Sequence, residues 1–298
     1  MGDALECDSS TSCGSCGTAG TCDSATQQRH MEEQLALRLQ SIRHRLAVMS
    51  GKGGVGKTTV AVNLAVALAK LGLTVGILDG DVHGPNIPKM LGIDKNGLYM
   101  GENGLLPATA RDNVKVMSMA FMLQGEDTPI AWRGPMKHSL FQQFLSEVDW
   151  GNLDYLIVDL PPGTGDEPLS IAQLLGKPLW TIIVTTPQEV ALLDSRKSVV
   201  FGQTLEMNVL GIVENMSGLT CPHCGKQIDL FKTGGGKRAA EELGVPFLGS
   251  VPIDPSVVTG GDDGIPIFYT NPDSPTALVF QQLGERVHNS MNNLDKRS

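Results

Sequence analysis

A glycine-rich segment near residue 50 has the residue types and the spacing of a phosphate-binding loop. Residues 51–58 read GKGGVGKT and match the pattern GxxxxGK followed by Ser or Thr. The glycines allow backbone N–H groups to wrap phosphate oxygens, and Lys57 would reach the β- and γ-phosphates of a nucleotide. The Thr58 hydroxyl would bind Mg²⁺. The predicted nucleotide contacts of this loop are Gly51, Gly53, Gly54, Val55, Gly56, Lys57, Thr58 and Thr59.

Three aspartates stand at the ends of apolar segments farther along the chain. Asp79 and Asp81 close the segment LTVGILDGD, and Asp159 closes DYLIVD. A carboxylate at such a place can orient an attacking water molecule or hold the water shell of Mg²⁺. A single aspartate there is commonly a helix cap or a turn residue. Capping or turn roles are a poor explanation for three aspartates placed around one phosphate loop.

A pair of cysteines, Cys221 and Cys224, forms the sequence CPHCG far downstream. Two thiolates at this spacing can bind one metal centre, whereas a [4Fe–4S] cluster or a Zn²⁺ ion needs about four ligands. A two-fold dimer would bring two copies together and complete the set. Zn²⁺ binding stays open as an alternative, and a redox-active pair is disfavoured because no thioredoxin-like βαβ context surrounds it.

Four more cysteines, Cys7, Cys13, Cys16 and Cys22, crowd the start of the chain. Residues 1–26 are rich in small and polar side chains and cannot build a core, so we expect a flexible tail unless a metal organises it. The four thiolates could hold a [4Fe–4S] cluster within one chain, with Zn²⁺ as the alternative. We therefore divide the chain into a cysteine-rich segment, 1–26, and a nucleotide-binding domain, 27–298.

Alternating strands and helices must position these groups. We predict an amphipathic helix over 27–44 and a buried strand over 45–50, directly before the glycine-rich loop and a helix over 59–71. This context argues against a fortuitous glycine-rich turn. The alternation implies an α/β fold with a parallel sheet flanked by helices, whose ligands bind at the carboxyl ends of the strands. Further strands are predicted near 73–81, 154–159, 179–187, 209–217 and 246–254, and further helices near 167–176, 189–206, 234–243 and 275–293.

The composition, 41% hydrophobic and 18% charged over 298 residues, fits one large α/β domain with appendages. Apolar runs fall far short of the ~20 residues that span a bilayer, and no signal-peptide pattern opens the chain, so we expect a cytoplasmic protein. In that compartment, clustered cysteines favour metal binding over disulfides. The net charge of -9 disfavours nucleic acid and anionic membranes as partners.

The loop KGGVGKT, with its second lysine at Lys52, resembles that of the deviant Walker A P-loop ATPases, which include MinD, ParA and the nitrogenase iron protein. The resemblance implies that Lys52 reaches across a dimer interface to the partner's nucleotide, as an arginine finger does. A solvated loop charge is the alternative. It also implies that Asp81 positions the attacking water, Asp159 is the Walker B aspartate and the Gly163 amide senses the γ-phosphate. Asn215 would hydrogen-bond adenine, which favours ATP, with a plain turn asparagine as the alternative. The implied catalytic residues are Lys52, Lys57 and Asp81, with Asp79 beside them in the nucleotide site.

The resemblance narrows when five motifs are taken in order. The succession KGGVGKT, DGDVHGPNIP, DLPPGTGD, ENMSG and CPHCG resembles the Mrp/ApbC family of iron–sulfur cluster carriers, over roughly residues 40–290. This implies that Cys221 and Cys224 of two subunits hold a transferable [4Fe–4S] cluster. Cys13, Cys16 and Cys22 match the end of the ferredoxin-like motif of the family's eukaryotic scaffold branch. That branch places its first cysteine farther upstream than Cys7, which puts Cys7 in doubt as a ligand.

The hypothesis that follows is a homodimeric ATPase with slow turnover. It would bind ATP, Mg²⁺ and a [4Fe–4S] cluster, pair through the CxxC motif, and transfer the cluster to apoproteins. A positioning ATPase of the MinD/ParA type is one alternative, although residues 275–298 would make a mediocre membrane helix. An ATP-driven electron donor with a bridging cluster is the other. We expect no nucleic acid and no membrane among the partners.

Overall fold

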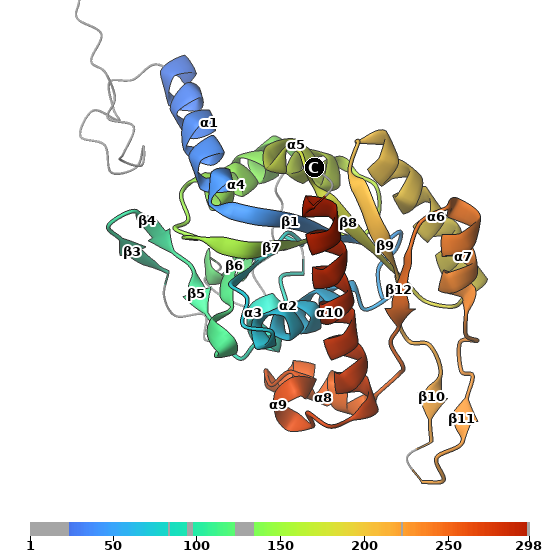
Figure 1. Ribbon diagram of the computed structural model, residues 1–298. Coiled ribbons are helices and arrows are strands. Elements are labelled where there is room, and N and C mark those ends of the chain that lie inside the picture. Colours follow the sequence, from blue (N-terminus) through green and yellow to red (C-terminus); the bar gives the residue numbers. More distant parts are fainter. Residues whose placement is uncertain (1–23, 83, 94–97, 123–133, 222, 297–298) are drawn as a thin grey trace, which may run out of the picture.

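Among the residues that the computed structural model describes, eight strands form one sheet (Figure 1). The model describes residues 24–82, 84–93, 98–122, 134–221 and 223–296, so the four N-terminal cysteines, Cys7, Cys13, Cys16 and Cys22, lie outside the described residues. The strand order is β12-β9-β8-β1-β7-β2-β6-β5, and all neighbours are parallel except β5 and β6. The strands span β1 Ile42–Met49, β2 Val75–Asp79, β5 Ala108–Thr109, β6 Lys115–Ser118, β7 Leu153–Asp159, β8 Trp180–Thr185, β9 Asn208–Glu214 and β12 Phe247–Ser250.

Helices cover both faces of this sheet (Figure 1). Successive side chains of a strand point to opposite faces, so Leu46 and Val48 join one core while Ala47 and Met49 join the other. The first core is closed by α2 and α10, and the second by α1, α4, α5, α6 and α7. The helices span α1 Ser24–Gln40, α2 Lys57–Lys70, α3 Ile87–Met90, α4 Gly134–Ser146, α5 Asp166–Leu175, α6 Glu189–Thr204, α7 Gly235–Leu243, α8 Pro255–Asp263, α9 Ile267–Thr270 and α10 Pro275–Asp295.

The predicted α/β architecture is confirmed, but the helix expected over 27–44 is wrong at both ends. The helix α1 begins at Ser24 and ends at Gln40, and β1 already starts at Ile42. At the start of β1, Ile42 and His44 are buried while Arg43 is exposed. This is the period-two pattern of a strand. Ile42 lies three residues after Leu39, so it also fitted the helical spacing, and that coincidence extended the predicted helix too far.

Two small hairpins stand apart from the main sheet. One pairs β3, Tyr99–Gly101, with β4, Gly104–Leu106, and the other pairs β10, Leu219–Thr220, with β11, Gln227–Ile228. The β10–β11 hairpin projects away from the body of the molecule (Figure 1). Two short 3-10 turns, at Arg111–Asn113 and Met119–Met122, flank β6. Among the described helices, none has the length and apolar character needed to cross a membrane.

Candidate functional site

The glycine-rich loop connects β1 to α2 at the carboxyl edge of the sheet, as the sequence predicts. Gly56 has a φ of 77°, in the left-handed region that glycine adopts without steric cost. A side chain at Gly56 would also collide with the amide of Asn215. α2 begins immediately afterwards at Lys57, so the positive end of its dipole faces the loop. Backbone N–H groups and a helix terminus therefore converge where an anion would bind.

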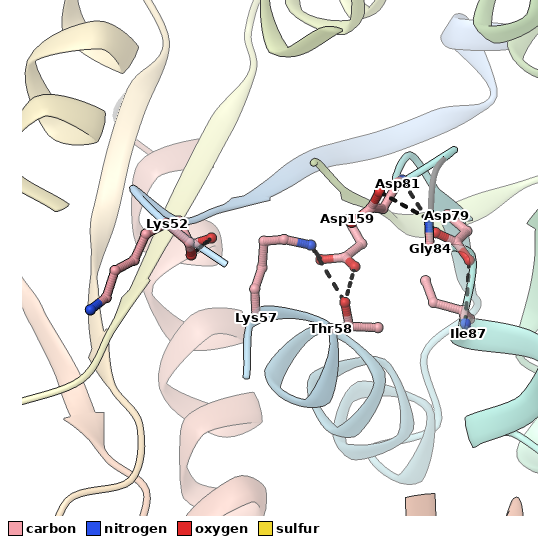
Figure 2. Close-up of polar contacts among 9 residues, drawn as sticks. Lys52, Lys57, Thr58, Asp79, Asp81, Gly84, Ile87 and Asp159 are labelled. Atoms are coloured by element: carbon pink, nitrogen blue, oxygen red, sulfur yellow. Dashed lines mark hydrogen bonds and ion pairs between the residues drawn. The ribbon is translucent and has the colours of Figure 1, made fainter. Parts of the chain in front are cut away.

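Lys57, Thr58 and Asp159 point toward one another at this edge (Figure 2). Lys57 Nζ lies 2.6 Å from Asp159 Oδ1, and the Thr58 hydroxyl donates to Asp159 Oδ2 over 2.6 Å. Burial raises the pKa of Asp159, and the charge of Lys57 acts in the opposite direction. A lysine, a hydroxyl and a carboxylate in contact are the groups that hold Mg²⁺ and the β- and γ-phosphates in P-loop enzymes. The set fits Mg–ATP.

The segment after β2 is organised by Asp79. This carboxylate is buried and accepts hydrogen bonds from the Ser118 hydroxyl at 3.0 Å and from the backbone N–H groups of Asp81 and Ile87, each at 3.3 Å. Burial raises the pKa of Asp79 to about 8, and the nearby charge of Asp159 adds to the effect. Asp81 is partly exposed and accepts from the N–H of Gly84 at 3.3 Å. Asp79 thus shapes the segment, and Asp81 remains accessible for a water molecule.

Ser118 is a site residue that the sequence analysis missed. It closes the short strand β6 beside β2, and its hydroxyl also accepts from the N–H of Ala120 at 3.1 Å. The available signal was a serine that follows the apolar residues Val116 and Met117, much as Asp79 ends its own strand. The strand has only four residues. A strand this short contains too few residues for its alternating pattern to be recognised in the sequence.

Gly163 and Lys52 are not among the contacts of the Lys57 cluster, which is formed by Lys57, Thr58 and Asp159. The Gly163 amide donates to the Ser50 carbonyl at 2.8 Å, so its proposed role toward a γ-phosphate requires that this hydrogen bond be exchanged. The side chain of Lys52 points away from Lys57 and Asp159 (Figure 2). This direction fits a contact made outside its own nucleotide site.

A cavity of ≈ 530 Å³ opens beside the loop and gives room for a nucleoside. Asn215 contributes to its wall, and its side-chain N–H₂ donates to the Val55 carbonyl at 2.8 Å. Asn215 therefore supports the phosphate loop as well as facing the cavity. Much of the lining comes from α3 and α8, two short helices that are not among the predicted elements, and from residues 251–254, which follow β12 and fall inside the strand predicted near 246–254. The lining residues include Thr58, Thr59, Met90, Val251, Pro252 and Val257.

Cys221 and Cys224 lie in the turn of the β10–β11 hairpin, apart from the Lys57 cluster. Cys221 is partly exposed and Cys224 is exposed. The backbone N–H groups of His223 and Cys224 face the Cys221 sulfur and lower the pKa of that thiol. Within the described ranges, no group of three or more His, Cys, Asp or Glu side chains is placed to hold a metal ion. The hairpin of one chain thus supplies two of the roughly four ligands that a cluster or Zn²⁺ requires.

Comparison with protein families agrees with this geometry. A family model described as ParA, NUBPL iron-transfer P-loop NTPase, matches residues 41–288. Two archaeal relatives are named iron-sulfur cluster carrier protein. The one from Methanocaldococcus jannaschii is 47% identical over 249 residues, covering 84% of this chain and 85% of the relative. The one from Saccharolobus solfataricus is 47% identical over 261 residues, covering 88% of each.

Solved structures give the same fold. A nucleotide-binding protein from Archaeoglobus fulgidus in complex with ADP superposes with a TM-score of 0.72 at 39% identity, covering 83% of this chain and 95% of that one. The cell division ATPase MinD from Pyrococcus furiosus superposes with a TM-score of 0.61 at 24% identity, covering 83% and 99%. The second likeness supports the fold alone.

Proposed function

We propose that this chain, which belongs to the NUBPL iron-transfer P-loop NTPase family, carries an iron–sulfur cluster on Cys221 and Cys224 and delivers it to apoproteins under the control of ATP. One observation carries the proposal. A phosphate loop with Lys57, Thr58 and Asp159 in place occurs in the same chain as a cysteine pair on a projecting hairpin, where Cys221 is partly exposed and Cys224 is exposed. A cluster held there by few ligands would be open to a recipient protein.

The nucleotide side of the function is ATP binding and hydrolysis with Mg²⁺. We assign phosphate binding to the loop amides and Lys57, and Mg²⁺ binding to Thr58 and, directly or through water, Asp159. Asp81 would position the attacking water, because it remains accessible while Asp79 is occupied in shaping the segment. The structure of the Archaeoglobus relative in complex with ADP supports the cavity beside the loop as the nucleoside site.

The cluster side of the function needs a second copy of the chain. One hairpin offers two thiolates, and a [4Fe–4S] cluster takes about four, so a two-fold dimer would hold the cluster between two hairpins. Lys52 points away from its own Lys57 cluster, as a residue that contacts the partner's nucleotide would. We propose further that Cys13, Cys16 and Cys22 bind a second cluster in the segment 1–26, where Cys7 departs from the spacing of the motif, and that the protein acts in the cytoplasm.

The two alternatives are less well supported. A positioning ATPase of the MinD type shares the fold, but the MinD likeness is 24% identical, whereas the relatives at 47% identity are named cluster carriers. An electron donor would keep its cluster on the protein while the cluster is alternately reduced and oxidised. The carrier and the donor therefore differ in whether iron leaves the chain.

Iron transfer tests the proposal directly. The chain is reconstituted anaerobically, freed of unbound iron, and mixed with an apo-enzyme whose activity needs a [4Fe–4S] cluster, with and without Mg–ATP. We expect activity to return together with radiolabelled iron, even when a chelator traps free iron, and the Cys221→Ala/Cys224→Ala variant to lose this transfer. Enzyme that stays inactive while the chain keeps all its iron would refute the carrier function.

A further inference from the structure

The strand end next to the nucleotide cavity also holds the base of the cysteine hairpin. β9 ends at Glu214, whose carboxylate is buried, and the next residue is Asn215. Asn215 is tied to the phosphate loop through Val55 and to β8, where its N–H donates to the Thr185 carbonyl at 2.7 Å. The neighbouring side chains of Glu214 and Asn215 thus face the base of the cysteine hairpin and the nucleotide cavity, respectively.

Glu214 binds both roots of the hairpin. Its Oε1 accepts from the Ser217 hydroxyl at 2.5 Å, where the chain leaves the body, and from the Gly234 N–H at 2.9 Å, where the chain returns. Its Oε2 accepts from the N–H of Gly236, in the first turn of α7. The Ser250 hydroxyl adds a longer contact to Oε1 at 3.4 Å. One carboxylate therefore fixes both ends of the segment that carries the two cysteines.

The backbone around Glu214 is built for this close approach. A Cβ on Gly236 would lie 2.9 Å from the Glu214 Cβ, so only glycine lets the start of α7 reach the carboxylate. The positive end of the α7 dipole stabilises the negative charge that has been removed from water. The outgoing root is also tied down by backbone bonds, from Ser217 N–H to the Val251 carbonyl at 2.9 Å and from Ile253 N–H to the Gly218 carbonyl at 2.8 Å.

We propose that Glu214 is the positioning residue that couples the nucleotide site to the cysteine hairpin. Any shift of the phosphate loop on nucleotide binding passes through Asn215 to the end of β9, and Glu214 carries it to both hairpin roots. This coupling would let ATP regulate the cysteine site of the proposed cluster carrier, so its biological role rests on the proposed function. The contacts of Glu214 with the hairpin involve no metal, so the coupling is also expected in the metal-free chain.

The test variant is Glu214→Gln. Glutamine has nearly the same shape but only one acceptor oxygen, so its N–H₂ must face either the Gly236 N–H or the pair of donors from Ser217 and Gly234. The matched control is Glu242→Gln, an exposed glutamate on α7 that pairs with Arg196. Ser217→Ala is a second variant, because it removes a single hydrogen bond from one root and leaves the carboxylate satisfied by the backbone.

The measurement is the alkylation rate of Cys221 and Cys224 in metal-free, reduced chain, resolved by peptide mass spectrometry, with and without Mg–ATP. In the wild type and in Glu242→Gln, we expect Mg–ATP to change the rate by about fivefold or more, the scale of a typical coupling free energy. In Glu214→Gln the change should fall to less than about twofold while the affinity for ATP stays within about threefold of wild type, and Ser217→Ala should lie between them.

Two results would overturn the inference. One is a wild-type chain whose hairpin cysteines react equally fast with and without Mg–ATP. The other is a Glu214→Gln chain, or a Ser217→Ala chain if the former does not fold, that keeps the full wild-type response. Failure of the carrier function is a separate outcome. Alkylation is measured on metal-free chain, so its response to Mg–ATP would persist even if the chain transferred no iron.

Discussion

Lys57 Nζ lies 2.6 Å from Asp159 Oδ1, and the two side chains are 6% and 0% exposed. The phosphate-loop lysine is therefore held in place by the strand-end aspartate and not by solvent. A buried charge pair of this kind depends strongly on both partners, because either one alone would be an uncompensated charge in the protein interior. When Mg–ATP binds, Lys57 would interact with the nucleotide phosphates and Asp159 with Mg²⁺.

Replacing Lys57 by Ala should abolish ATP binding and also destabilise the fold. The variant leaves Asp159 buried without its cation, which typically costs about 3–5 kcal/mol of unfolding free energy. The double variant Lys57→Ala/Asp159→Asn removes the stranded charge and should recover most of the stability without recovering ATP binding. Chemical denaturation and nucleotide titration measure the two effects. If the single and double variants prove equally unstable, the charge pair does not have the role assigned to it.

The unfolding free energy should fall as pH rises through the range set by Asp79. Its pKa is about 8 in the folded chain against an ordinary value of 3.8. Between these values the folded chain binds about one proton more than the unfolded chain, so the contribution is full below the lower value, declines with rising pH and levels off above about 8.

Asp79→Asn should flatten that decline by up to about 1.4 kcal/mol per pH unit. The measurement is urea denaturation from pH 5 to pH 8 without nucleotide or Mg²⁺, with the exposed Asp273→Asn as control. A decline that is equally steep in wild type and in Asp79→Asn would show that Asp79 does not titrate in this range.

Lys52→Ala should keep the fold and lose catalysis. Its side chain points away from the charges of its own site (Figure 2), so removal should change the unfolding free energy by less than about 0.5 kcal/mol. ATP turnover should fall by about 10³-fold if Lys52 acts on the partner's phosphates as an arginine finger does. The control is Lys197→Ala, an exposed lysine on α6. Turnover in Lys52→Ala that matches this control would make Lys52 an ordinary loop charge.

Asn215 should affect nucleotide affinity through the loop and base selectivity through the cavity. Asn215→Asp removes the donor to the Val55 carbonyl but keeps an acceptor, so ATP and GTP should both bind more weakly while their ratio holds. Asn215→Ala removes both groups, and the preference for ATP over GTP should also decline, by about tenfold if one hydrogen bond to the base is lost. Calorimetry with both nucleotides measures this. An unchanged ratio in Asn215→Ala would assign the residue to loop support alone.

The phosphate loop and the sheet, apart from the short strands β5 and β6, were predictable because their signals are local. Strands such as residues 45–50 and 154–159 have continuous runs of large or apolar side chains at their centres, LAVM and YLIV, as buried parallel strands do, and GKGGVGKT fixes its own backbone geometry. The boundary at Ile42 failed because that position fits both the helical and the strand period.

The contacts that connect sites were out of reach for the opposite reason. Glu214 meets Gly234 and Gly236, and Asp79 meets Ser118, across long separations in the chain. No periodicity reports such pairs. A glutamate that ends an apolar strand in VLGIVE is the one hint of a buried carboxylate that the sequence of β9 contains.

In the proposed function, Cys221 and Cys224 of two copies of the chain hold one cluster between them. The most direct test of this arrangement is the native mass, measured together with iron and sulfide content, of anaerobically reconstituted chain in which Cys7, Cys13, Cys16 and Cys22 are all replaced by Ser. We expect a dimer with about two iron atoms per chain, and we expect both the iron and the dimer to be lost when Cys221→Ala is added. A single-chain mass in every nucleotide state, with zinc or no metal on the hairpin, would contradict it.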